Sequence, residues 1–382
     1  MSNDFRTLPD LAVRALGGSV VYANDEAFAD RENLIRADAA AFDESSFGHK
    51  GKVYDGWETR RRRERGHDVA IVRLGAPGVV RGVVIDTAWF KGNYPPEASV
   101  EAACVSGYPS VAELVDDTTW ETILARSEIK GDTENAFPVD SERRWTHVRL
   151  SIYPDGGVAR FRVHGEVLPD PRVLDAMGSL DLAALDNGAL VVDCSNKFYS
   201  SPNNLISPGL TRTMGEGWET ARRRDDGNDW VTVQLAGAGT LVMAELDTSY
   251  FLGNSPGWAA LSGYDGAPAE SSEHIELLPR TRLQPDTRHR FLLSGPRQVT
   301  HVRLDIYPDG GMSRLRLLGS LAPQGRERVG LRWFNAVSAR TATQALEQDG
   351  VSSADAEILV ARRPIARGDD LPAGVRRRLC GA

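Results

Sequence analysis

Two stretches of the chain carry a Trp-Glu-Thr unit followed by a block of arginines. The first reads DGWETRRRRERGHD at residues 55–68, and the second reads EGWETARRRDDGND at residues 216–229. A planar guanidinium can bind a carboxylate through two parallel hydrogen bonds, and a Glu carboxyl group can give or take a proton. These residue types therefore indicate a site for a small anionic ligand, present in two versions along one chain.

Three blocks recur in the same order along the chain. Residues 55–95 and 216–256 are identical at 18 of 41 positions, residues 146–165 match 300–319, and residues 17–35 match 188–206. The offset changes from block to block, which indicates duplication of a whole domain with loop insertions. We therefore predict a first domain at 1–167, a linker with one short helix at 168–187, a second domain at 188–325 and a tail at 326–382.

The segments between the turns alternate apolar and polar residues, as strands do. In HVRLSIY, for example, Val148, Leu150 and Ile152 share one face of the predicted strand. Many short segments of this kind are separated by Gly- and Pro-containing turns such as PDGG, and long helical periodicity is absent from both repeats. The pattern predicts an all-β fold of two tandem jelly-roll sandwiches, followed by a short helical C-terminal tail.

The PDGG turn also predicts the positions of several arginines. If it closes a four-residue hairpin, Arg149 lies opposite Arg162, and Arg303 lies opposite Arg316 in the second copy. Two arginines side by side on one sheet face repel unless they have acidic partners or a bound anion. The pairs therefore indicate either an Arg–carboxylate network or a carboxylate-binding site, and the residues alone leave both interpretations open.

Composition excludes several classes of function. The net charge of −8 argues against a general nucleic-acid surface. Three cysteines at unrelated spacings indicate no disulfide framework and fit a reducing compartment. The chain has no signal-peptide pattern and no run of about 20 apolar residues, so we predict a cytoplasmic protein that does not enter a membrane. No nucleophile, P-loop or dinucleotide signature appears, so we predict no cofactor. His, Asp and Glu are present but not at a recognisable metal-ligand spacing, so we assign no metal site and leave a metal requirement open.

Four segments together resemble a known family. ANDEAFADRENLI, KGKVYDGWETRRRRERGHD, VIDTAWFKGNYP and VRLSIYPDGG are similar to the allantoicase (allantoate amidinohydrolase) family, over roughly residues 10–325. The resemblance implies hydrolysis of allantoate to ureidoglycolate and urea, in allantoin degradation for nitrogen recovery. It also implies two jelly-roll domains akin to galactose-binding modules, assembled into a homo-oligomer. Val69 stands where the family usually has Trp, and DTAWF replaces DTAFF, but neither change removes a charge.

The chemistry of allantoate suggests roles for the repeated residues. Its carboxylate needs an Arg clamp, and cleavage of a C–N bond needs a general acid and a general base. We expect acid–base work from Glu58 and His147 and an orienting role for Asp86. The substrate-binding candidates are Arg61, Arg62, Arg149 and Trp57, and the second-copy equivalents are Glu219, Arg222, Arg223, His301, Asp247 and Arg303.

The two copies are not equivalent. Arg60 is replaced by Ala221, and His67 is replaced by Asn228. This divergence favours one working site, in the first copy, and it also places His67 outside the architecture that the copies share.

Two other classes of function stay open. A jelly-roll protein of this type could bind a carbohydrate or another ligand without turnover, or it could be a hydrolase or lyase of a related ureido acid such as ureidoglycolate. An assay of urea release from allantoate separates the first alternative from allantoicase activity, and comparison of the two substrates decides the second.

Overall fold

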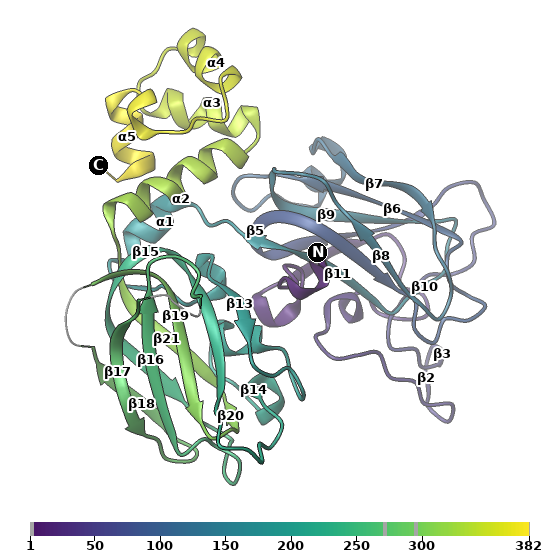
Figure 1. Ribbon diagram of the computed structural model, residues 1–382. Coiled ribbons are helices and arrows are strands. Elements are labelled where there is room, and N and C mark those ends of the chain that lie inside the picture. Colours follow the sequence, from purple (N-terminus) through teal and green to yellow (C-terminus); the bar gives the residue numbers. More distant parts are fainter. Residues whose placement is uncertain (1–3, 270–272, 294–296, 382) are drawn as a thin grey trace. The chain divides into compact units, whose positions relative to one another are not determined.

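The computed structural model describes residues 4–269, 273–293 and 297–381 (Figure 1). The chain divides into two compact units, one comprising Met1–Leu168 with Ala336–Gln344 and the other Pro169–Asn335 with Ala345–Ala382. The predicted boundaries at 167, 187 and 325 stay predictions. Each unit contains a sandwich of antiparallel strands.

The first unit is organised around one long strand, β5 (Asp68–Asp86). Its first part pairs with β1 (Ser19–Ala23) and β9 (Arg144–Tyr153), and its second part pairs with β8 (Glu134–Pro138) and β11 (Arg160–Val167). Because a strand has only two edges, these four partners divide between two layers, and β5 passes from one layer to the other. Next to β9 lie β6 (Glu97–Ala103) and then β7 (Glu121–Glu128).

Short strand pairs complete the first unit at the loops. β4 (Trp57–Glu58) pairs with β10 (Gly157–Val158), and β2 (Phe47–Gly48) pairs with β3 (Gly51–Lys52). Val148, Leu150 and Ile152 are completely buried in the core, as the predicted alternation of residues 147–153 requires. His147 and Ser151 on the other face are buried as well, so that face is not the exposed polar face that the alternation predicted.

The second unit repeats this topology. The long strand β15 (Asp229–Asp247) pairs in its first part with β13 (Leu190–Cys194) and β19 (Gln298–Tyr307), and in its second part with β18 (Arg288–Leu292) and β21 (Arg314–Leu321). The remaining strands of this unit are β12 (Leu180–Asp181), β14 (Trp218–Glu219), β16 (Trp258–Tyr264), β17 (Ile275–Arg282) and β20 (Gly311–Met312). The predicted all-β fold of two tandem jelly-roll sandwiches is thereby confirmed.

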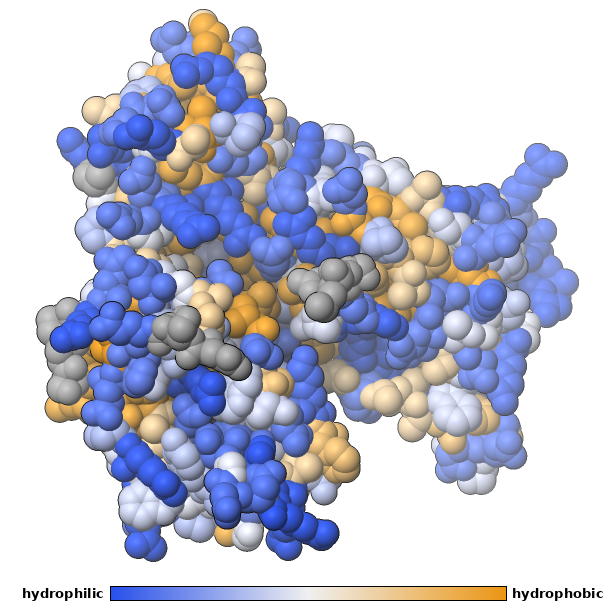
Figure 2. Space-filling view, in the orientation of Figure 1, coloured by the Kyte–Doolittle hydropathy of each residue, from blue (hydrophilic) through white to orange (hydrophobic). Residues whose placement is uncertain are grey.

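Helices occur mainly near the C-terminus, as predicted. α1 (Pro171–Met177) begins with Asp170 as its N-cap and Pro171 in its first turn, both of which favour a helix start. The tail contains α2 (Pro323–Ala336), α3 (Ala339–Gln348), α4 (Ser353–Ala361) and α5 (Ala373–Cys380). In the part of the chain that the structure describes, no helix is both long and apolar enough to cross a membrane. The face drawn in Figure 2 is mostly hydrophilic, with apolar residues in separate patches.

The predicted hairpin across the PDGG turn is wrong. After β9 the chain enters β10, which pairs with β4, and then β11, which pairs with β5 in the other layer. Arg149 therefore lies opposite Ile71 and Glu101, while Arg162 lies opposite Val84. In the second unit, likewise, Arg303 lies opposite Thr232 and Ser262, and Arg316 lies opposite Glu245. The change of layer separates guanidinium groups that would repel each other on adjacent strands.

Candidate functional site

The repeated motifs meet at one end of each sandwich. In the first unit the Thr59 N–H donates to the Gly156 carbonyl (3.1 Å), and the Gly157 N–H donates to the Asn93 carbonyl (2.8 Å). A Cβ on Gly157 would lie 2.0 Å from the Phe90 ring, so only glycine allows this close packing. The second unit repeats these contacts with Thr220, Gly310, Gly311 and Asn254. The Trp-Glu-Thr, Gly-Asn and PDGG segments are therefore fixed to one another in both copies.

Glu58 is a buried carboxyl group at this end of the first unit. Its side chain is 8% exposed, and its Oε1 accepts a 2.7 Å hydrogen bond from Asn93 Nδ2. Burial raises the pKa of Glu58, an effect that the bond from Asn93 partly offsets. Its counterpart Glu219 is half-buried and accepts the same bond from Asn254 Nδ2 (2.6 Å). A carboxyl group with a raised pKa is suited to donating a proton.

Trp57 is a core residue. Its side chain is completely buried, and its indole N–H donates to the Asp25 carbonyl at 2.7 Å. Its predicted contact with substrate has no support from this position, because the ring does not reach the surface.

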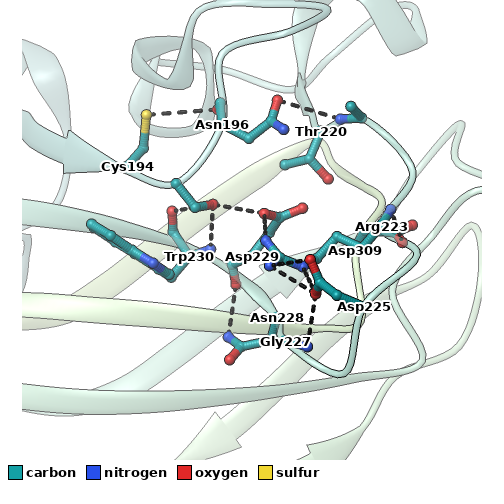
Figure 3. Close-up of polar contacts among 12 residues, drawn as sticks. Cys194, Asn196, Thr220, Arg223, Asp225, Gly227, Asn228, Asp229, Trp230 and Asp309 are labelled. Carbon is teal, nitrogen blue, oxygen red and sulfur yellow. Dashed lines mark hydrogen bonds and ion pairs between the residues drawn. The ribbon is translucent and has the colours of Figure 1, made fainter.

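A buried aspartate orients one arginine in each unit. In the first unit, Asp68 Oδ1 accepts hydrogen bonds from Arg62 Nε and Asn24 Nδ2, each at 2.9 Å. In the second unit, Asp229 Oδ1 accepts from Arg223 Nη1 and Ser195 Oγ, also at 2.9 Å (Figure 3).

Both aspartates keep one oxygen without a protein partner. Asp68 and Asp229 are at most 2% exposed, and neither Oδ2 has a hydrogen-bond partner among the described residues. Because both oxygens are completely buried, a ligand N–H reaches them only if the side chains around them move.

His67 lies beside two arginines in the first unit. His67 is exposed, but partial desolvation lowers its pKa, and the positive charges of Arg62 and Arg149 lower it further. Its ring centroid is 4.9 Å from that of Tyr153. We call Arg62, His67, Asp68, Glu101 and Arg149 the His67 cluster.

Arg149 is held in place on the same sheet face. Its Nε donates to Glu101 Oε2 (2.8 Å), and its guanidinium lies 4.8 Å from the centre of the Trp120 ring. The Arg149 side chain is still 24% exposed, and the Arg62 side chain is 27% exposed. Both guanidinium groups therefore remain accessible to a ligand.

The second unit differs at the position of His67. Asn228 replaces the imidazole and donates to Asp305 Oδ1 (2.9 Å), and Arg303 Nη2 donates to the same oxygen (2.9 Å). Arg303 also covers the Trp230 ring at 4.4 Å. This copy thus has no imidazole at this position, and a carboxylate on the same strand neutralises its arginine.

Arg61 and Arg222 lie on the exposed loops that follow β4 and β14. Neither side chain forms an ion pair or hydrogen bond within the described part of the chain. Arg61 could therefore reach a ligand, but no protein contact orients it.

Asp86 belongs to the other layer of the first unit. It ends β5 opposite Arg160 and Glu134, and its Oδ1 accepts from the Ala88 N–H (2.8 Å). Burial raises the pKa of Asp86, and the negative charge of Glu134 also raises it. The counterpart Asp247 is 1% exposed, and an Arg replaces Glu134 opposite it.

The structure does not bring His147 to Glu58. His147 lies six residues before Tyr153 on β9, so it is about 20 Å from the Glu58 end of the strand. It is 3% exposed and shares a 2.9 Å hydrogen bond with Thr146 Oγ1. His301 has the same contact with Thr300 in the second unit, and burial lowers its pKa.

His147 gives the protein a predictable sensitivity to acid. Burial, assisted by the charge of Arg73, lowers its pKa to about 4, against about 6.5 for an unfolded chain. As the pH falls, the unfolded chain therefore binds the proton at this histidine first. The contribution of His147 to the free energy of unfolding is fully present above pH 6.5 and is lost as the pH falls toward 4, by on the order of 3 kcal/mol.

Urea unfolding at about pH 7 and about pH 4 measures this loss in free energy of unfolding. We expect His147→Gln to lose less stability in acid than the wild type. Replacement of the exposed His49 by Gln is the control and should behave as the wild type. Equal acid losses in all three proteins would contradict the prediction.

Sequence reasoning missed His67, Asp68 and Glu101. Comparison of the two copies places His67 outside the set of shared candidate residues, because the second copy has Asn228 there. If only one copy carries a working site, however, a residue that only that copy has is a good candidate. Among the described residues no group of three or more His, Cys, Asp or Glu side chains could hold a metal ion.

Fold and candidate site together define a tandem jelly-roll protein that carries guanidinium, imidazole and carboxyl groups at one end of its first sandwich. The model of the allantoicase repeat family matches residues 9–168 and 180–322. The chain belongs to the allantoicase family, as its sequence motifs predicted.

Individual relatives agree with the family match. A probable allantoicase of Nocardia farcinica is 59% identical over 83% of this chain and 95% of its own length. The allantoicase of Dictyostelium discoideum is 42% identical over 80% and 85%. The crystal structure of allantoicase from Saccharomyces cerevisiae superposes with a TM-score of 0.73 at 34% identity, covering 83% of this chain and 96% of that one.

Proposed function

We propose that this protein hydrolyses allantoate to ureidoglycolate and urea, a step of allantoin degradation. The observation that carries this proposal is the 59% identity to a probable allantoicase across 95% of that protein. Water supplies a hydroxyl group to the central carbon and a proton to the departing urea nitrogen. The reaction therefore needs a base for water, an acid for nitrogen and a binding site for the carboxylate.

The His67 cluster supplies two of these needs in our proposal. Arg62 and Arg149 bind the substrate carboxylate, because both guanidinium groups are oriented by acidic residues and both remain accessible. His67 accepts the proton from water, since its lowered pKa favours the neutral imidazole. The buried Asp68 holds Arg62 in position for this contact through its Oδ1.

Glu58 is the proposed proton donor to the urea nitrogen, because its raised pKa favours the protonated form. Asp86 has a proposed orienting role, because it lies opposite Arg160. Arg61 has a proposed supporting role, because its positive charge attracts the anionic substrate. His147 takes no part in the proposed reaction. The second-unit residues Glu219, Arg222, Arg223, His301, Asp247 and Arg303 are proposed to be non-catalytic.

Urea release from allantoate by the purified protein tests the proposal directly. We expect stoichiometric urea and ureidoglycolate. Binding of allantoate without urea would instead indicate a ligand-binding protein. Turnover of ureidoglycolate but not of allantoate would indicate an enzyme for the related ureido acid.

Replacing Glu58 with Gln should lower kcat for allantoate by about a hundredfold, because the amide cannot donate a carboxyl proton. The amide keeps the shape of the side chain, so the bond with Asn93 has a substitute acceptor. Glu219→Gln is the matched control in the second unit and should retain kcat within about twofold. Unchanged turnover in folded Glu58→Gln protein would remove Glu58 from the mechanism.

We further propose a homo-oligomer in the cytoplasm that does not bind nucleic acid. The oligomer rests on the resemblance to the allantoicase family alone; the net charge of −8 supports the absence of nucleic-acid binding, and three cysteines without disulfide partners support a reducing compartment. Sedimentation analysis and cell fractionation test them.

A further inference from the structure

A cavity of about 390 Å³ lies in the first unit beside His147. Its lining includes Ser19, Arg31, Glu32, Arg73, Leu114 and His147, and it includes no member of the His67 cluster. Its volume is within the range of small-molecule sites, which begins at about 300 Å³.

The charged groups of this cavity suit a small carboxylate. Arg73 lies directly opposite His147 on the adjacent strand, and only one of its N–H groups has an acceptor among the described residues, the Gly17 carbonyl (3.2 Å). Arg31 contributes a second guanidinium, which contacts Glu26 at 3.3 Å. Two guanidinium groups can bind one carboxylate through several charge-assisted hydrogen bonds.

The cavity also offers groups for a neutral polar part of the ligand. Glu32 is half exposed, and its nearest cation, Arg14, is 4.0 Å away, so its carboxylate can accept an N–H. One His147 nitrogen is engaged by Thr146, which leaves the other for the ligand. A carboxylate next to an amide-type N–H would satisfy all of these groups.

The second unit shows that the fold does not require these charges. In register with His301, Gln234 occupies the position of Arg73. Pro202 and Asn203 occupy the positions of Arg31 and Glu32. The His–Thr contact is retained without either arginine, so the two cations of the first unit are not needed to build the sandwich.

We propose that this cavity is a second ligand site of the first unit, separate from the His67 cluster, and that it binds a small carboxylate bearing a ureido or similar N–H group. Such a site would allow the substrate or product class of the proposed reaction to bind twice per chain. The choice of a ureido acid rests on the proposed function.

Isothermal titration calorimetry with N-carbamoylglycine tests the proposal. This probe has one carboxylate and one ureido group and lacks the second ureido group that the reaction releases. We expect two binding events per wild-type chain and one per Arg73→Gln chain, with affinity at the cavity weakened at least about tenfold. Arg149→Gln should also leave one binding event, and the variant that combines Arg73→Gln with Arg149→Gln should show no binding event. N-methylurea, which lacks the carboxylate, should not bind.

Two further measurements make the result decisive. Arg31→Gln, which leaves the sheet unchanged, should weaken the same event as Arg73→Gln, and thermal unfolding shows whether each variant is folded. Urea release by Arg73→Gln should stay within about twofold of the wild type at saturating allantoate.

Three results would overturn the second site. These are a single wild-type event that Arg73→Gln leaves unchanged, two unchanged events in folded Arg73→Gln, or loss of turnover together with binding in that variant. The last result would place the reaction in this cavity. A wild type that binds the probe as expected but releases no urea would overturn the proposed function alone.

Discussion

Arg149→Gln is expected to lower kcat/KM for allantoate about a thousandfold, because a guanidinium that makes two hydrogen bonds to a carboxylate contributes about 4 kcal/mol. The Arg149 side chain is oriented by Glu101 and Trp120 and is 24% exposed, so it can make these bonds without rearrangement. Gln keeps the apolar part of the chain but loses the charge.

Arg303→Gln is the matched control. Arg303 occupies the same position on β19 as Arg149 does on β9 and is likewise ion-paired, with Asp305, and stacked on a ring, that of Trp230. The second unit differs in having Asn228 where the first has His67. We expect its kcat/KM to stay within about twofold of the wild type. If the two variants lose activity equally, or if folded Arg149→Gln retains more than about a tenth of it, Arg149 does not bind the substrate carboxylate.

His67→Asn is expected to lower kcat about a thousandfold and to change KM only a few-fold, because it removes the proposed base while both arginines remain. The substitution introduces the residue that the second unit has at position 228, so the local fold tolerates it. The reciprocal variant Asn228→His should gain no activity, since Asp305, which now bonds Asn228, would pair with the introduced imidazole.

The pH dependence provides a second measurement of His67. A base must be neutral, so wild-type kcat/KM should fall as the pH drops through the pKa of His67, which lies below the ordinary value of about 6.5. This acid limb should disappear from the residual activity of His67→Asn. A variant with wild-type kcat, or one that retains the same acid limb, would exclude His67 as the base.

Local patterns predicted much of the fold. Alternation along HVRLSIY identified the buried face of β9, and the repeated Gly, Asn and Asp positions identified the loops that meet beside Glu58. The hairpin prediction failed because two strands that are adjacent in sequence lie in different layers. A turn motif restricts a few residues of backbone, but it does not determine which edge of β5 receives the following strand.

The sequence by itself determined the family, the duplicated all-β architecture and the supply of arginine and acidic side chains, because alternation, turn chemistry and motif order are properties of short segments. Only the tertiary structure decided which of these side chains meet. His67 and Arg149 are distant in the sequence and become neighbours because β5 pairs with β9, whereas His147, on the same strand as Arg149, lies about 20 Å from the Glu58 end. Strand pairing between distant segments is set by the packing of the whole sandwich, and short-range patterns carry no information about it.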